Sequence, residues 1–166
     1  DYELVEIDAT RFNVARRLAL GEGVQPTWVT APTASGRVFV TGNNTAKIFE
    51  VDIKAWQVVR SFDTGHGPYN LAVTPDESTL IVTYKSGAAI GFWDLRSGLE
   101  RARVETSRTI PHSVVVTPDG DYAFVTLEGV GREPGTVEVY HVASAKRVGT
   151  IDVGKQAGGL AFWKTD

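Results

Sequence analysis

Residues 111–126, PHSVVVTPDGDYAFVT, decide the fold of this chain. Apolar and small residues alternate on both sides of a Thr-Pro-Asp-Gly turn, which predicts two antiparallel strands joined as a hairpin. Pro118 fixes its own φ for the second position of the turn, and Gly120 accepts whatever φ the exit requires. Nearly the same pattern occurs at residues 68–83, PYNLAVTPDESTLIVT, and a looser version at 26–41, PTWVTAPTASGRVFVT. The hairpin is therefore a repeated element.

The hairpin belongs to a longer repeating unit. Each unit has a strand-like segment that ends at an anchor residue, and the steps between anchors are 44, 42 and 47 residues: Asp8, Asp52, Asp94 and His141. We expect four short strands per unit, namely the two arms of the hairpin, a third strand such as Lys47–Asp52, and a fourth such as Gln57–Phe62. Four antiparallel strands at this period predict a β-propeller blade. A sandwich or a single barrel would explain the strands but not the recurrence of the whole unit.

The 166-residue chain is thus predicted to be all-β and to hold about four blades' worth of one propeller domain. The predicted units are a half-blade at 1–25, blades at 26–67, 68–110 and 111–156, and the first strand of another blade at 157–166. An open arc would expose apolar blade faces, and the chain starts at Asp1 without a methionine, so we expect part of a larger propeller. The alternatives are a closed four-bladed ring with an incomplete blade and the association of two arcs.

Composition excludes several classes of function. The 17 Lys plus Arg against 20 Asp plus Glu give a net charge of -3, which favours no nucleic acid partner. The absence of cysteine excludes disulfides, thiolate nucleophiles and Cys-ligated zinc. No apolar run approaches the roughly 18 residues of a membrane-spanning helix. Arg16, Arg101 and Arg147 fall on predicted fourth strands, where we interpret them as solvated protection of an outer edge.

Loop lengths separate two faces of the predicted propeller. From the opening proline to the closing threonine of each hairpin there are always 15 residues, from 26 to 41, 68 to 83 and 111 to 126. The loops between second and third strands, and those between blades, vary in length, and Leu127–Gly135 carries an insertion. Because successive turns of a meander leave on alternate sides, all the variable loops share one face. Variable loops on a fixed scaffold carry recognition, so we expect the functional site on this variable-loop face.

Six residues of the variable-loop face are candidates for ligand binding: His66, Tyr69, Tyr84, His112, Glu128 and Arg132. His66 and His112 adjoin first strands, which line the channel of a propeller, so these two could converge near its mouth. Two histidines without a third ligand make a poor metal site, and each could simply satisfy a local carbonyl, so no metal is predicted. The chain contains no G-x-S-x-G, H-E-x-x-H or P-loop motif, so no catalytic residue is predicted and enzymatic activity stays open.

The repeated hairpins, each followed by an Asp-ended third strand and a Gly-rich link, resemble the YVTN-type β-propeller repeat, and VFVTGNN at 38–44 resembles the tetrapeptide that names it. The resemblance implies a bacterial or archaeal protein, usually seven-bladed and exported to the periplasm or cell exterior. Relatives include surface-layer proteins, lactonase-like enzymes, and propellers of periplasmic redox enzymes such as amine dehydrogenase chains and cytochrome d1 nitrite reductase. The matching residues are scaffold, so no particular cofactor is implied, and His112 stands where the repeat commonly has histidine.

Two functions fit these observations. The first is an exported, non-catalytic binding or scaffolding module that engages a protein or a small-molecule ligand through the variable-loop face. The second is a propeller subunit or domain of a periplasmic redox enzyme or lactonase-like enzyme, with a cofactor or substrate at the channel mouth. Further partners are the remaining blades of the same protein, or a second copy that completes the ring. Nucleic acid is not an expected partner.

Overall fold

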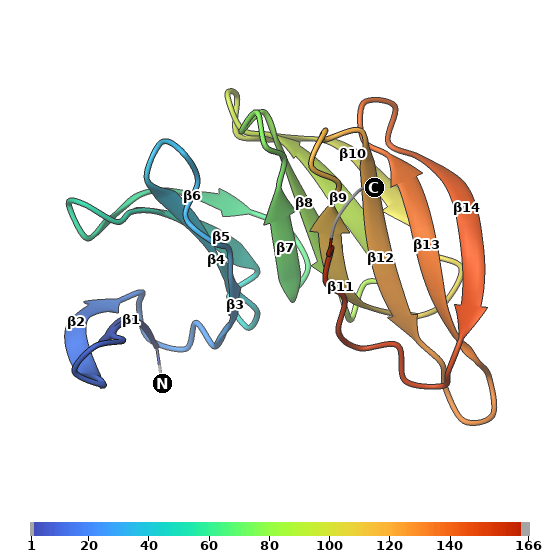
Figure 1. Ribbon diagram of the computed structural model, residues 1–166, viewed down its shortest axis with the longest axis horizontal. Helices are drawn as coiled ribbons and strands as arrows, with labels where there is room; N and C mark the ends of the chain where they lie inside the picture. The colour runs from blue at the N-terminus through green and yellow to red at the C-terminus, as the bar shows by residue number, and fades with distance from the viewer. Residues whose placement is uncertain (1, 164–166) are drawn as a thin grey trace.

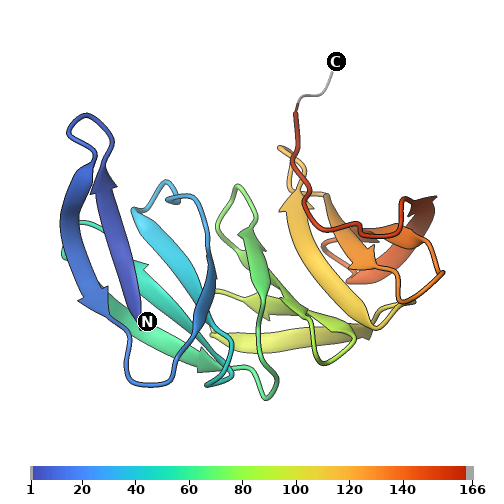
Figure 2. The same cartoon turned by 90° about the horizontal axis from the view of Figure 1, so that it is seen from below.

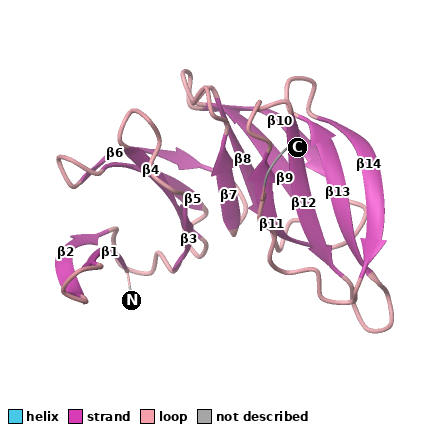
Figure 3. Ribbon diagram, viewed as in Figure 1, coloured by secondary structure: helices cyan, strands magenta, loops and turns pink. Residues whose placement is uncertain are grey.

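The computed structural model describes residues 2–163, which form fourteen strands and no helix (Figures 1 and 3). All strands pair antiparallel, in one two-stranded sheet and three four-stranded sheets. We call the first sheet the half-blade; it contains β1 (Glu3–Asp8) and β2 (Asn13–Ala19). Blade 1 contains β3 (Pro26–Val29), β4 (Arg37–Gly42), β5 (Lys47–Asp52) and β6 (Gln57–Asp63). Blade 2 contains β7 (Asn70–Val73), β8 (Thr79–Tyr84), β9 (Ala89–Asp94) and β10 (Leu99–Glu105). Blade 3 contains β11 (Ile110–Val116), β12 (Tyr122–Glu128), β13 (Gly135–His141) and β14 (Lys146–Val153).

The blades are meanders that stand side by side. Within each blade the strands pair in chain order, so the first strand is one edge of the sheet and the fourth is the other. The blades form an arc with the first strands β3, β7 and β11 along its concave side (Figure 2). The prediction of an all-β propeller built from four-stranded repeats is therefore confirmed.

Side chains of the Thr-Pro-Asp motif build the hairpin turn. The Thr117 hydroxyl donates to the carboxylate of Asp119 and accepts the first backbone N–H of β12 at 3.1 Å. Asp119 Oδ1 also accepts the backbone N–H of Asp121 at 3.0 Å. Gly120 leaves the turn with a φ of 83°, and Glu77 holds the same place in blade 2 with a φ of 55°. The turn thus has the geometry that its residues predict.

The aspartates that end the third strands form hydrogen bonds with the turn that follows. Asp52 Oδ1 accepts the backbone N–H of Ala55 at 2.8 Å, and Asp94 Oδ1 accepts that of Ser97 at 2.6 Å. Each carboxylate therefore satisfies the turn between the third and fourth strands of its blade. In blade 3 the ring nitrogen Nδ1 of His141 lies 2.9 Å from a serine hydroxyl three residues later, so the turn survives the loss of the aspartate.

The turn carboxylates make stability sensitive to acid, and Asp52→Asn tests this. The Ala55 N–H, with a further contribution from Arg37, holds the pKa of Asp52 below its ordinary value. The unfolded chain therefore binds the proton more readily, so this stabilisation is present above about pH 4 and is lost as the pH falls. We expect the stability difference between wild type and Asp52→Asn, measured by urea unfolding, to shrink from pH 5 to pH 3. A difference that does not change with pH would contradict this account.

Apolar residues pack between the blades and make the arc cohesive. In blade 2, Leu80 and Val82 pack toward blade 1, whereas Ile81 packs toward blade 3, so β8 is buried on both faces. Fully burying one such side chain contributes about 1.5–3 kcal/mol. The cluster between blades 2 and 3 contains Ile81, Ile90 and Phe92 with Val114, Ala123, Val125 and Tyr140. Every residue of β8 is consequently buried.

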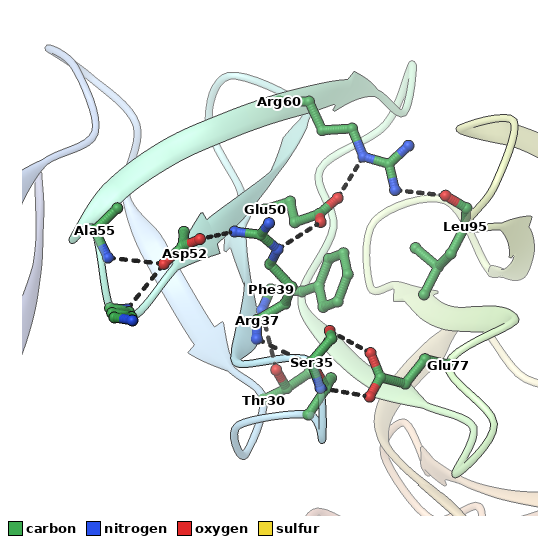
Figure 4. A network of polar contacts seen from close by, with 12 residues as sticks. Thr30, Ser35, Arg37, Phe39, Glu50, Asp52, Ala55, Arg60, Glu77 and Leu95 are labelled. Carbon is green, nitrogen blue, oxygen red and sulfur yellow. Dashed lines mark hydrogen bonds and ion pairs between the residues drawn. The ribbon is translucent and has the colours of Figure 1, made fainter.

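A network of polar contacts also joins blade 1 to blade 2 (Figure 4). Arg60 on β6 pairs with Glu50 on β5 and donates through Nη2 to the carbonyl of Leu95 in blade 2 at 2.5 Å. Nearby, the backbone N–H of Ser35 donates to Glu77 Oε1 at 2.9 Å. These contacts connect the loops on the constant-loop side of the two blades.

The outer-strand arginines are exposed or partly exposed, as solvated edge protection expects, but they also make specific contacts. Arg101 on β10 donates through Nη2 to the carbonyl of Val142 in blade 3 at 2.5 Å. Arg16 on β2 lies over the Trp56 ring of blade 1, with its guanidinium carbon 4.3 Å from the ring centroid. Arg147 pairs with a buried glutamate of its own blade. The guanidinium fork is long enough to cross from one blade to the next, which the position of an arginine on an edge strand does not reveal.

The loops divide between two faces as their lengths predict. In blade 2 the two constant loops are joined by the Leu95 N–H, which donates to the Ser78 carbonyl at 2.9 Å. On the other side, variable loops meet where the Gly129 N–H donates to the Lys155 carbonyl at 2.9 Å.

The predicted first strand at 157–166 is not a strand in its described part, residues 157–163, and the rest lies outside the described residues. Its start nevertheless occupies the place of a first strand. The Thr126 hydroxyl donates to the Gly158 carbonyl at 2.8 Å, as the Thr83 hydroxyl donates to the His112 carbonyl at 2.9 Å. A strand needs a neighbouring strand that pairs with it through backbone hydrogen bonds, and no described strand pairs with this segment.

Candidate functional site at the variable-loop rim

Two repeat positions of each blade meet at the inner rim of the variable-loop face. The first is the residue after the opening proline of the hairpin, and the second lies two residues after its closing threonine. In chain order the first position holds Thr27, Tyr69 and His112, and the second holds Asn43, Lys85 and Glu128. Because the blades repeat, the fold places these side chains in a row along the rim.

Four of these side chains, Tyr69, Lys85, His112 and Glu128, form what we call the rim cluster. Lys85 Nζ lies 3.0 Å from Glu128 Oε1 and 4.5 Å from the centroid of the Tyr69 ring. His112 Nε2 lies 3.3 Å from the same carboxylate oxygen, and its ring centroid is 4.7 Å from that of Tyr69. The cluster therefore links blade 2 to blade 3 through one shared carboxylate oxygen.

The environment of His112 favours the neutral ring. Partial burial and the positive charge of Lys85 lower the pKa of His112, and they outweigh the opposing effects of Glu128 and the Gly158 carbonyl. The Nδ1 atom of His112 lies 3.1 Å from that carbonyl. His112 is thus held on three sides, by Tyr69, Glu128 and Gly158.

A pocket of about 480 Å³ opens beside the rim cluster. It is lined by Thr27, Asn43, Tyr69, Lys85, Ser86 and Ile110. The Asn43 amide donates to the Pro68 carbonyl at 3.2 Å, which fixes one wall. The pocket therefore offers an ammonium, a phenol, hydroxyls and an amide oxygen over a small apolar patch.

The six predicted ligand-binding residues do not all reach this site. Tyr69, His112 and Glu128 come together. His66 packs against Tyr84, with 6.4 Å between the ring centroids. Arg132 is exposed in the loop 129–134 and makes no ion pair within the described part of the chain.

The prediction that Tyr84 lines the binding site is wrong. Its side chain is fully buried in the core between blades 1 and 2. Its hydroxyl accepts the Trp93 indole N–H at 2.8 Å and donates to Glu100 Oε1 at 2.9 Å. Burial raises the pKa of Tyr84 far above its ordinary value, so the phenol stays protonated. Tyr84 is the last residue of β8 and points between the blades, whereas Lys85, one residue later, points to the rim.

A second and larger hollow, of about 570 Å³, lies along the concave side of the arc. It is lined by residues of the three first strands, among them Trp28, Val73 and Val115, and by Leu160 and Phe162. Its walls are mostly apolar. Trp28 is 46 % exposed there.

Within residues 2–163, no group of three or more His, Asp or Glu side chains is arranged to hold a metal ion. In that same range, no helix has the length and apolar character needed to cross a membrane.

No family model matches this chain, and no curated protein sequence matches it. Solved structures do match. Hydrazine synthase from Kuenenia stuttgartiensis has a TM-score of 0.82 and 22% identity, over 92% of this chain and 44% of that chain. Dihydro-heme d1 dehydrogenase NirN, in complex with DHE, has a TM-score of 0.72 and 18% identity, over 93% and 34%. A functionally unknown protein from Desulfotomaculum acetoxidans DSM 771 has a TM-score of 0.71 and 17% identity, over 94% and 52%.

These likenesses concern the fold. The chain spans between about a third and about half of the length of the three matched chains. At such identities a shared propeller fold does not carry a shared site or activity. By its fold, this chain is therefore a β-propeller protein.

Proposed function

We propose that this chain is a ligand-binding domain of an exported, YVTN-type β-propeller protein, and that its variable-loop rim binds a small polar ligand. The observation that carries the proposal is the rim cluster beside its pocket. Four groups from two blades fix one another at the edge of a hollow of about 480 Å³, namely an ammonium, a carboxylate, an imidazole and a phenol. That volume lies within the usual range of small-molecule sites.

The chemistry of the pocket narrows the ligand. Lys85 and Glu128 neutralise each other, so the site carries no strong net charge at neutral pH. The hydroxyls of Thr27 and Ser86 and the amide of Asn43 offer donors and acceptors. A polar, uncharged or zwitterionic small molecule fits these groups better than a polyanion or an apolar ligand.

Tyr69→Ala should weaken binding of such a ligand about tenfold, which corresponds to about 1.4 kcal/mol. The ring forms part of the pocket wall and supports Lys85, so its removal affects both. The measurement is an NMR titration of the labelled chain with a set of sugars, amino acids and nucleosides, followed through backbone amide shifts. Tyr122→Ala is the matched control, because this half-exposed tyrosine lies at the constant-loop end of β12.

Shifts around Asn43, Lys85 and Ser86 that weaken only in Tyr69→Ala would support the proposal. Shifts confined to the constant-loop face, or titrations that both variants leave unchanged, would contradict it. If none of the compounds binds but a protein partner protects the same amides, the rim is a protein-binding surface instead.

A propeller domain of a periplasmic redox enzyme is the second candidate, and the concave hollow favours it. Two structures of similar fold are named as enzymes, hydrazine synthase and dihydro-heme d1 dehydrogenase. This function requires a cofactor or substrate on the concave side, near Trp28 and Phe162. If an added cofactor or substrate quenches tryptophan fluorescence in wild type, and quenches it less in Trp28→Phe, the concave site is favoured over the rim site.

The outer face of blade 3, at one end of the arc, is a candidate surface for a partner. Val148 and Ile151 on β14 are more than half exposed, on a blade whose other face is packed. We propose that another blade covers this flank, supplied by the same protein or by a second copy of the chain. Sedimentation equilibrium of the 166-residue chain separates the two sources, because only the second makes it self-associate.

A further inference from the structure

His112 faces two hydrogen-bond acceptors at once. Its Nδ1 lies 3.1 Å from the Gly158 carbonyl, and its Nε2 lies 3.3 Å from Glu128 Oε1. A neutral imidazole carries one N–H and can donate to one of them, whereas an imidazolium carries two. The number of hydrogen bonds that His112 makes therefore depends on its protonation state.

Both acceptors already have another donor. Glu128 Oε1 lies 3.0 Å from Lys85 Nζ, and the Gly158 carbonyl accepts the Thr126 hydroxyl at 2.8 Å. Neither oxygen is left unpaired when His112 donates elsewhere. The neutral state is consequently tolerated, and adding a proton redistributes the contacts instead of creating the only ones.

The groups that face His112 come from every element packed against it. Lys85 belongs to the β8–β9 loop, Glu128 to β12, and Tyr69 to the link before β7. The chain at Gly158 contributes a carbonyl. One permanent cation and the titratable ring thus share a single carboxylate oxygen.

We infer that His112 is a proton-responsive latch at the rim, which on protonation binds Glu128 and the Gly158 carbonyl together and releases Lys85 toward the pocket. The imidazolium competes with Lys85 for Glu128 Oε1 and repels the ammonium. Lys85 already lies over Tyr69 and lines the pocket, so a small rotation of its flexible side chain is enough.

The direction of the switch follows from burial. Burial and Lys85 hold the pKa of His112 below its ordinary value, so at pH 7 the ring is neutral and Lys85 keeps its ion pair with Glu128. When the pH falls below that pKa, the ring is protonated and Lys85 is released. Its release gives the pocket an unpaired positive charge. If the proposed function holds, an anionic ligand on Lys85 binds more tightly at lower pH, and by linkage it makes His112 easier to protonate.

The test needs no ligand, so its failure is distinguishable from failure of the proposed function. The chain has three histidines, and the ring nitrogens of each are followed by NMR from pH 8 to pH 4.5. We expect the Gly158 and Gly159 amides and the Lys85 side-chain signals to shift with the midpoint of His112. His66 and His141 are the internal references for other titrations.

Two substitutions test the charges separately. Lys85→Met should raise the midpoint of His112, because a nearby cation is lost, and Glu128→Gln should lower it. Lys54→Met, an exposed lysine on the constant-loop side, is the matched control and should leave it unchanged. Gly158 and Lys85 signals that ignore the titration of His112, or a midpoint unmoved in both variants, would overturn the latch. If one variant does not fold, the wild-type coupling and the other variant still decide.

Discussion

Phe92→Ala should lower the free energy of unfolding by about 3–5 kcal/mol. Phe92 lies on β9 and is fully buried between blades 2 and 3. Its ring centroid is 6.1 Å from that of Tyr140 in the next blade, at a tilt of 58°. Removing the ring leaves a cavity at a contact between two sheets, which the surrounding strands cannot close without changing their spacing. Urea unfolding followed by circular dichroism measures the loss.

Phe12→Ala is the matched control for this cavity. Phe12 is 86 % exposed in the turn of the half-blade, so the same substitution should change stability by less than about 0.5 kcal/mol. Similar losses in the two variants would mean that the blades do not share a cooperative core. A second, separate unfolding transition in Phe92→Ala would mean that blades 2 and 3 unfold independently.

The difference between these two phenylalanines is visible in the sequence only in part. The repeat predicts four strands per blade, the anchors predict where third strands end, and the Thr-Pro-Asp turns fix the hairpins. Phe92 and Phe12 therefore fall on a strand and in a turn. Which neighbouring blade Phe92 packs against is not encoded locally, because both faces of a blade strand are apolar and the alternation cannot distinguish them.

The candidate site was predictable to a similar extent. Loop lengths predict which face carries the variable loops, and Tyr69, His112 and Glu128 meet at its rim. Tyr84 and Lys85 were harder to separate, since a change of one residue at a strand end reverses the direction of the side chain. The signal that finds Lys85 is its repeat position, which is equivalent to that of Glu128. Long-range reach, such as that of Arg101, depends on rotamers that no repeat pattern specifies.

Glu138→Ala should cost about 3 kcal/mol, because it removes the acceptor from a buried network. Glu138 is fully buried on β13, although it carries a charge. Arg147 Nη1 donates to it at 2.5 Å, the Ser107 N–H from the last loop of blade 2 donates at 2.9 Å, and the Tyr140 hydroxyl donates to its other oxygen. Without the carboxylate, the fully buried Tyr140 hydroxyl is left unpaired, and the more exposed Ser107 N–H loses its protein acceptor.

The remaining Glu138 variants separate charge from hydrogen bonding. Glu138→Gln keeps one acceptor oxygen and should cost less than Glu138→Ala. Arg147 is 37 % exposed at its side chain, so its own truncation to methionine should cost less than removal of the glutamate, since solvent reaches the guanidinium but not the carboxylate. The double variant Glu138→Leu, Arg147→Met removes both charges at once. We expect it to be more stable than Glu138→Ala. If all four variants unfold at the same urea concentration as wild type, the network does not hold blade 3 against blade 2, and apolar packing alone accounts for the contact.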